Sequence, residues 1–148
     1  MKFKYIYRIL LNVFSPIIST DSLADKFPVS AKALIFDDNR ILILKNDKGD
    51  WDLPGGKIEN SDKNIEHRLK EEVFEETQLE LKIFNLISSS IINYSGTKVL
   101  ILVFKCEISG TSAVKLSYEH SKFLFADLKS INEYQIPIWI KDALKKIN

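Results

Sequence analysis

Three glutamates near the middle of the chain, Glu72, Glu75 and Glu76, carry the clearest chemical signal in the sequence. At spacings of three and four they would share one face of a helix, within about a third of its circumference at roughly 100° per residue. Like charges this close repel and destabilise the helix. A cation bound between them would relieve the repulsion, so the cluster indicates a cation-binding site. Alone, however, the glutamates are explained more simply as a solvated acidic face.

The segment before this helix reverses that preference. Its sequence is Leu-Pro-Gly-Gly-Lys over residues 53–57. Glycines let the backbone approach closely, so a free carbonyl of Gly55 or Gly56 could complete a metal shell. Lys57 follows directly and could meet a phosphate. Carboxylate and carbonyl oxygens suit Mg²⁺, which neutralises phosphate charge and activates water, so the pattern indicates phosphoryl chemistry.

The elements that would position these residues follow from the hydrophobic pattern. Short apolar runs bounded by turn residues predict strands at 31–36, 40–45, 51–56, 79–92, 98–107 and 118–125. Apolar residues four apart predict a helix from a cap at Ser61 or Asp62 to about Gln78, and a second helix closes the chain at 138–147. Strands with a few interspersed helices predict an α/β fold in which helices cover a mixed sheet.

Size and composition are those of one globular domain. The chain has 148 residues, of which 45% are hydrophobic and 28% charged, so it can bury a substantial core. A net charge of +1 is unlike the basic surface of a general nucleic-acid binder, and no nucleic-acid partner is expected. The single cysteine, Cys106, cannot form an internal disulfide, which favours a reducing compartment, the cytoplasm.

The chain is expected to divide into an amino-terminal element with its connecting segment, residues 1–28, and a main domain, residues 29–148. The first residues are basic and then apolar, a faint outline of a secretion signal. Asn12 and Pro16 interrupt the apolar stretch, which is too short to span a bilayer. We therefore favour an element that packs on the domain or on a partner, and expect no membrane partner.

Residues 51–79 resemble the Nudix box, whose family form is G-x5-E-x7-R-E-U-x-E-E-x-G-U with U bulky and apolar. Gly56 fits the first glycine, residues 72–77 fit E-U-x-E-E-x, and Leu79 fits the final apolar position. The resemblance extends over residues 30–148, and the box is its specific part. It implies a Nudix-like α/β/α sandwich with a mixed β-sheet.

The resemblance also implies an activity: hydrolysis of a phosphoanhydride (pyrophosphate) bond in a nucleoside diphosphate linked to another group, with Mg²⁺ or Mn²⁺ as cofactor. Carried over by position, the implied metal ligands are a carbonyl of Gly55 or Gly56 and the carboxylates of Glu72, Glu75 and Glu76. One of these glutamates would act as base. Glu119, before a late strand, would add an acidic ligand, although an exposed glutamate at a strand start explains it equally well. The small-molecule nucleotide substrate stays open within this class.

The chain departs from the box at three points. The segment after Gly56 is one residue longer, and we place the insertion at residues 60–63, because an extra residue inside the helix would need a π-bulge. Glu71 stands where the box has arginine. Arg68, which points toward the same acidic face, is expected to replace it in part, with an ordinary surface ion pair as the alternative. Gln78 stands where the box has a glycine that ends the helix.

Two other functions remain open. One is a catalytically inactive Nudix-like domain that binds a nucleotide or a protein, which Glu71 and Gln78 support. The other is a structural domain with an acidic helix, attached to partners through residues 1–14. A homodimer is compatible with either. Residues interpreted as surface or packing positions are His67, His120, Trp51 and Tyr94.

Overall fold

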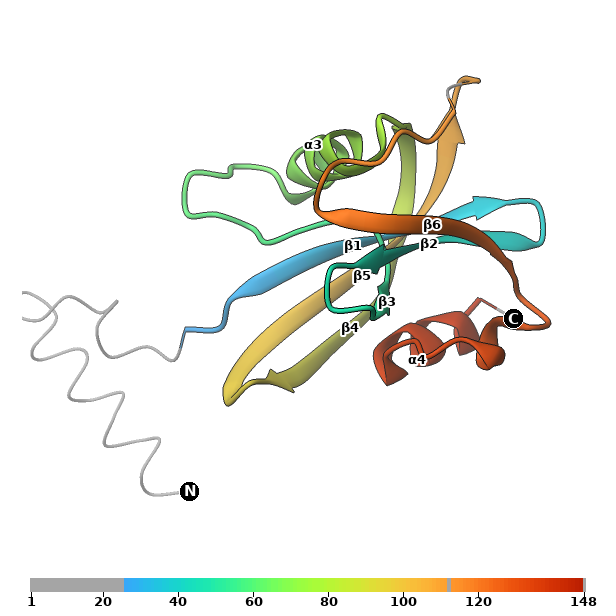
Figure 1. Cartoon of the computed structure of the whole chain (residues 1–148). Coiled ribbons are helices and arrows are strands. Elements are labelled where there is room, and N and C mark those ends of the chain that lie inside the picture. The colour runs from blue at the N-terminus through green and yellow to red at the C-terminus, as the bar shows by residue number, and fades with distance from the viewer. Residues whose placement is uncertain (1–25, 112, 148) are drawn as a thin grey trace, which may run out of the picture.

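The computed structural model describes residues 26–111 and 113–147 (Figure 1). The strands are β1 (Val29–Asp37), β2 (Arg40–Asn46), β3 (Trp51–Asp52), β4 (Glu80–Tyr94), β5 (Thr97–Ser109) and β6 (His120–Asp127). The helices are α3 (Ile65–Thr77), the short η1 (Ile131–Glu133) and α4 (Ile138–Lys145). Most of the predicted amino-terminal element, residues 1–25, lies outside the described part. Within that part no helix is long and apolar enough to cross a membrane.

The six strands form one mixed sheet in the order β3-β2-β1-β5-β4, with β6 also paired to β2. β1 and β5 run parallel, whereas the other pairs are antiparallel. β1 and β2 pair only next to their connecting turn, at Phe36 with Ile41 and Asp37 with Arg40. The two strands therefore diverge, and the rest of this β1 edge is open to another segment.

The segment that follows β3 lies along this open edge. Its backbone pairs with β1 through hydrogen bonds from Ala33 to Pro54 at 2.8 Å, from Ala31 to Gly56 at 2.9 Å and from Ile58 to Val29 at 2.8 Å. The sequence had predicted a strand over 51–56, but only Trp51 and Asp52 pair with β2. The polypeptide leaves β2 after these two residues because it crosses to β1, and this crossing brings the glycine pair to the sheet.

Two apolar clusters, one on each face of the sheet, complete the sandwich. On β1 the side chains alternate, so that Ala33 packs in the cluster under α3 with Leu69, while Leu34 packs in the cluster under α4 with Ile140. Figure 1 shows α3 and α4 on opposite sides of the sheet. The predicted α/β/α sandwich with a mixed sheet is confirmed.

The start of α3 differs from the prediction. The cap is Asn64, whose side chain accepts a hydrogen bond from the His67 amide at 2.8 Å. Asp62 instead accepts a bond from the Glu59 amide at 2.7 Å, and so closes a turn before the helix. The helix is α-helical throughout Ile65–Thr77, which agrees with an insertion in the preceding loop.

At its carboxyl end α3 stops as the box glycine would stop it. Gln78 adopts the left-handed conformation, with φ 60° and ψ 19°, and its amide donates to the Phe74 carbonyl at 2.8 Å. Its side-chain amide donates to the same carbonyl at 3.0 Å. A residue with a Cβ pays for this conformation, so the turn is retained at a cost in stability.

Candidate active site

Helix α3 is oriented by its buried apolar side. Leu69 and Val73 are fully buried against the sheet. The three predicted glutamates lie at different depths on the neighbouring face: Glu76 is buried, Glu72 is partly buried and Glu75 is exposed. The helix thus presents three carboxylates at different depths.

The two glycines bring the backbone against this row. A Cβ at Gly56 would lie 2.2 Å from Glu72 Oε2, and one at Gly55 would lie 2.3 Å from the Ala31 carbonyl oxygen. Gly55 also has φ +122°, which favours glycine. The turn over residues 53–56, named here the glycine turn, therefore fits between β1 and α3 because neither position carries a side chain.

The carboxylate of Glu76 is held from two directions. The Gly55 amide donates to its Oε2 at 2.7 Å, and His120 Nε2 lies 3.0 Å from its Oε1. The side chain of His120 is 12% exposed, so its interpretation as a surface residue is wrong. The hydrogen bond to Glu76 raises the pKa of His120, against the opposing effect of burial. The sequence signal was a histidine directly after the candidate ligand Glu119.

Arg68 lies among four carboxylates. Its guanidinium contacts Glu72 and lies 3.8 Å from Asp62, 3.6 Å from Glu71 and 3.7 Å from Glu75, counting the nearest atoms of each pair. The structure thus places Arg68 on the acidic face, one turn before Glu72, as the sequence predicted. A bridging guanidinium can orient carboxylates, which is the geometric part of the role expected for the missing box arginine.

The pKa of Glu72 is set by its burial and by the charges around it. Burial raises the pKa of Glu72, Arg68 lowers it, and the charges of Glu76, Glu75 and Glu119 raise it further, with a net upward shift. Glu119 is exposed, yet its charge is felt at Glu72. A carboxylate whose pKa is raised by burial and by neighbouring negative charges is one that a divalent cation would stabilise in the ionised form.

The donor set fits a hard cation in chemistry, but not yet in arrangement. All the predicted ligands are oxygens, as Mg²⁺ and Mn²⁺ prefer. Among residues 26–111 and 113–147, however, no three side chains of His, Cys, Asp or Glu are arranged to bind one ion. Arg68 contacts Glu72, and the Gly55 amide and His120 contact Glu76. A cation at this face must share or replace these contacts.

The two candidate carbonyl ligands are also engaged. The Gly56 carbonyl accepts bonds from the Ala31 amide at 2.9 Å and from Ser30 Oγ at 3.2 Å. The Gly55 carbonyl accepts a bond from Lys32 Nζ at 3.1 Å. The Gly56 carbonyl is therefore bound to residues of β1 on two sides, whereas the Gly55 carbonyl is bound to the Lys32 side chain. No role was predicted for Lys32, although a lone lysine inside an apolar strand was the available signal.

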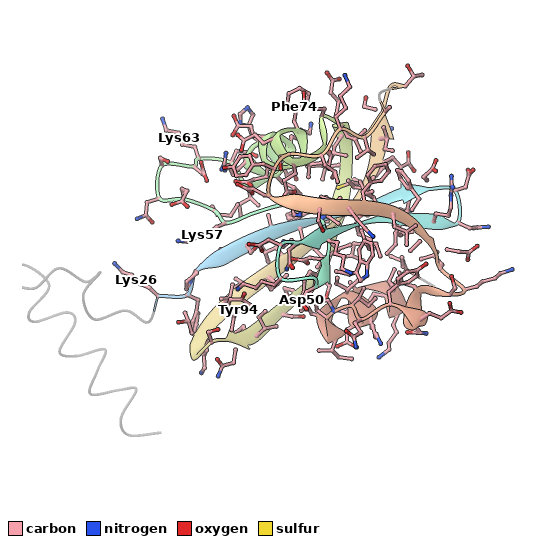
Figure 2. The ribbon with its side chains drawn as sticks, in the orientation of Figure 1. Lys26, Asp50, Lys57, Lys63, Phe74 and Tyr94 are labelled. Carbon is pink, nitrogen blue, oxygen red and sulfur yellow. The ribbon has the colours of Figure 1, made fainter. Side chains whose placement is uncertain are left out.

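A cavity of about 1000 Å³ opens on the other side of the glycine turn, on the α4 face of the sheet. Trp51 and Tyr134 pack edge to face in its wall, with ring centroids 6.0 Å apart. Tyr94 also lines the cavity and is 57% exposed, so its interpretation as a packing residue is wrong. Lys57, the predicted phosphate contact, is exposed at the cavity wall, and Figure 2 labels it together with Tyr94.

The fold is an α/β/α sandwich in which a glycine turn contacts the carboxylates of an acidic helix, and the comparisons identify the family that has it. The family model of the NUDIX domain matches residues 26–146, and the chain belongs to this family. Membership supports a hydrolase that acts on pyrophosphate bonds, in a family that generally uses divalent metals and small nucleotide substrates.

Individual relatives agree with this assignment. A MutT-like protein of Streptomyces ambofaciens is 32% identical over 81 residues, which cover 54% of this chain and 51% of the relative, about half its length. The crystal structure of the MutT protein from Methanosarcina mazei Go1 matches with a TM-score of 0.72 and 26% identity, over 82% of this chain and 92% of that one. A C. elegans Ap4A hydrolase shares the fold, with a TM-score of 0.72 at 16% identity over 81% and 94% of the two chains.

Proposed function

We propose that this protein is a Nudix-type pyrophosphohydrolase that requires Mg²⁺ or Mn²⁺ and cleaves a nucleoside diphosphate linked to another group. The observation that carries the proposal is the convergence of Glu72 and Glu76 on the glycine turn, with Glu75 next to them on α3. The cavity on the α4 face is lined by Asp52 and Lys57, the residues on either side of that turn. A substrate bound there would present its phosphates to the carboxylates.

The side chains divide the proposed work. Glu72, Glu75 and Glu76 would bind the cations, while the Gly55 carbonyl stays bound to Lys32 and the Gly56 carbonyl to β1. A bound divalent cation supplies neutralisation of the leaving phosphate and a lowered pKa of the attacking water. One of the glutamates, or Glu119, takes the proton of that water.

Two basic residues assist in this proposal. Arg68 orients the carboxylates of Glu71, Glu72 and Glu75 on α3 through its ion pairs with them. Lys57 meets a phosphate at the cavity wall. Its side chain is exposed, so the ammonium can reach an anion there without leaving other partners. Both roles rest on charge and position, and neither requires the box arginine that Glu71 replaces.

A nucleoside fits the character of the cavity. The rings of Trp51 and Tyr134 offer stacking surfaces for a base. Asn132 and Gln135 offer amide donors and acceptors to its edge, and Lys57 stands where phosphates would leave the cavity. A volume of about 1000 Å³ is at the upper end of small-molecule sites, enough for a nucleotide with an additional group.

The remaining expectations belong to the same proposal. Residues 29–148 form the hydrolase domain, and residues 1–28 precede it as a separate element. A cytoplasmic location agrees with Cys106, which is buried in the core and whose thiol pKa burial raises to about 12, so that it is kept as an inert thiol. The proposed substrate is a small nucleotide, with neither membrane nor nucleic acid as partner.

A second candidate, a nucleotide-binding domain without turnover, is favoured by two observations. Arg68 contacts Glu72 directly, and no cation-binding cluster is preformed among the described side chains. If Glu72 stays paired with Arg68 and cannot bind a cation, the nucleotide would bind in the cavity without being cleaved.

The two candidates separate in a turnover assay. Release of phosphate or pyrophosphate is measured over a panel of nucleotides with Mg²⁺ or Mn²⁺, for wild type, Glu76→Gln and the control Glu66→Gln. Glu66 is an exposed glutamate in the first turn of the same helix. Metal-dependent release that collapses only in Glu76→Gln supports the hydrolase. Nucleotide binding without release by wild type supports the second candidate.

A further inference from the structure

Lys32 is a charged residue in the apolar middle of β1. Its neighbours Ala31 and Ala33 are fully buried, and its own side chain is 13% exposed. It points to the α4 face of the sheet and lines the cavity. Burying a lysine this far requires partners for its ammonium, and the identity of those partners indicates what the residue does.

The ammonium of Lys32 binds three oxygen atoms, one from Asp52 just before the glycine turn and two from carbonyls within it. It lies 2.9 Å from Asp52 Oδ2, 3.2 Å from the Leu53 carbonyl and 3.1 Å from the Gly55 carbonyl. An ammonium has three donors, so these contacts satisfy it completely. Lys32 is thereby fixed to the turn.

The contacts of Lys32 complement those of the β1 backbone. The carbonyls of Pro54 and Gly56 accept bonds from β1 amides, whereas the alternate carbonyls, at residues 53 and 55, point to the other side, where only a side chain can reach them. All four consecutive carbonyls of the turn are thus held. On the opposite side of Gly55, its amide donates to Glu76 at 2.7 Å.

We propose that Lys32 is a positioning residue of the acidic site. Lys32 holds the carbonyl of Gly55 and thereby fixes the backbone orientation of this glycine. The Gly55 amide then points at Glu76 and orients its carboxylate. Without the ammonium, the alternate carbonyls would lose their partners and the turn would rotate toward solvent in the cavity. The inference deepens the proposed hydrolase function and rests on it only for the kinetic part of the test below.

A role in charge makes the opposite prediction. Lys32 is paired with Asp52, so removing the ammonium leaves an uncompensated carboxylate beside the glycine turn. If charge decided, Lys32→Met would bind cations more tightly, and the double variant Lys32→Met/Asp52→Asn would return to the wild-type affinity. If position decides, both variants bind cations more weakly, because the turn is loose in both.

The test is calorimetric titration of Mn²⁺ into the full-length chain without nucleotide. The variants are Lys32→Met, the double variant and Lys32→Arg. The control is Lys105→Met, since Lys105 pairs with Leu34 on the adjacent strand and lies over the Phe36 ring. We expect a 10- to 100-fold weaker affinity for Lys32→Met and for the double variant, in the range typical of residues that orient metal ligands. Lys32→Arg, which keeps several donors, should recover part of the loss.

Two further readouts separate positioning from general destabilisation. Hydrogen exchange of the Gly55 amide should be faster in Lys32→Met, while amides of the β4–β5 ladder stay protected as in wild type. With a nucleotide that wild type cleaves, kcat should fall while KM stays within about threefold. Should Lys32→Met fold poorly, Asp52→Asn keeps both carbonyl bonds and should lose less than threefold in Mn²⁺ affinity.

Unchanged or tighter Mn²⁺ binding by Lys32→Met, or wild-type affinity restored in the double variant, would overturn the proposal. So would unchanged exchange of the Gly55 amide. Absence of turnover in wild type contradicts the proposed function and leaves the titration and exchange comparisons intact. If wild type bound no Mn²⁺, the exchange of the Gly55 amide would still decide the role of Lys32.

Discussion

Replacing Glu72 by glutamine should make the metal-free protein more stable. Glutamine keeps the size of the side chain, so no cavity forms. The change removes two like-charge pairs on the helix, with Glu75 and Glu76, each costing about 0.2–0.5 kcal/mol, and one attraction to Arg68 of similar size. Relief of the burial cost, the largest cause of the raised pKa of Glu72, tips the balance. The net gain is about 0.5–1 kcal/mol.

The pH dependence fixes the sign of this effect. The pKa of Glu72 is raised in the folded protein above its ordinary value of 4.5, chiefly by burial, so folding favours its protonated form. Wild type therefore loses this stability as pH rises through the folded pKa, and Glu72→Gln does not. The difference between them should be near zero well below pH 4.5 and reach its maximum above the raised pKa.

Thermal unfolding with and without cation is the assay. At pH 8 in EDTA, Glu72→Gln should melt about 1–4 °C above wild type. Saturating Mn²⁺ should raise the melting temperature of wild type by mass action and leave that of Glu72→Gln nearly unchanged, so the order reverses. Glu66→Gln should respond to Mn²⁺ as wild type does. The reasoning is refuted if Glu72→Gln is less stable in EDTA at every pH, or gains as much from Mn²⁺.

Three further changes test other parts of the site. Gly56→Ala places a Cβ 2.2 Å from Glu72 Oε2, which should displace that carboxylate and reduce kcat at least 100-fold with the fold intact by circular dichroism; activity near wild type would contradict the close approach. Gln78→Gly should stabilise by about 0.5–1 kcal/mol in denaturant unfolding, because glycine adopts φ 60° without strain; a loss would show that the Phe74 contact outweighs the strain. Tyr134→Ala should raise KM for the nucleotide about tenfold with little change in kcat. A lower kcat with unchanged KM would show that the nucleobase does not stack on Tyr134.

Much of the scaffold was predictable because its signals are local. The apolar runs of β1, β2, β4 and β5 predict strands, and in the structure their apolar side chains enter the clusters on the two faces of the sheet. The spacing of Glu72 and Glu76 fixes a common side of α3, since helix geometry is nearly invariant. The glycine pair signalled close approach of backbone, which the structure shows at Glu72 and Ala31.

The parts that escaped prediction depend on contacts between distant segments. His120 meets Glu76 because β6 pairs with β2, and no local pattern encodes that pairing. Lys32 gains its partners because the polypeptide crosses from β2 to β1 after Asp52. The helix is capped by Asn64 rather than by the predicted Ser61 or Asp62, and the Asp62 carboxylate closes the preceding turn instead. Such choices depend on tertiary geometry.

The central claim, cleavage of a pyrophosphate bond by the acidic face of α3, is tested most directly by phosphorus NMR of the reaction in ¹⁸O-labelled water. With wild type and Mg²⁺ or Mn²⁺, the diphosphate resonances of at least one nucleotide should give way to phosphate products, one of which carries ¹⁸O. EDTA should stop the reaction, and Glu76→Gln should abolish it while Glu66→Gln does not. Intact nucleotides with wild type, or equal rates for wild type and Glu76→Gln, would contradict the account.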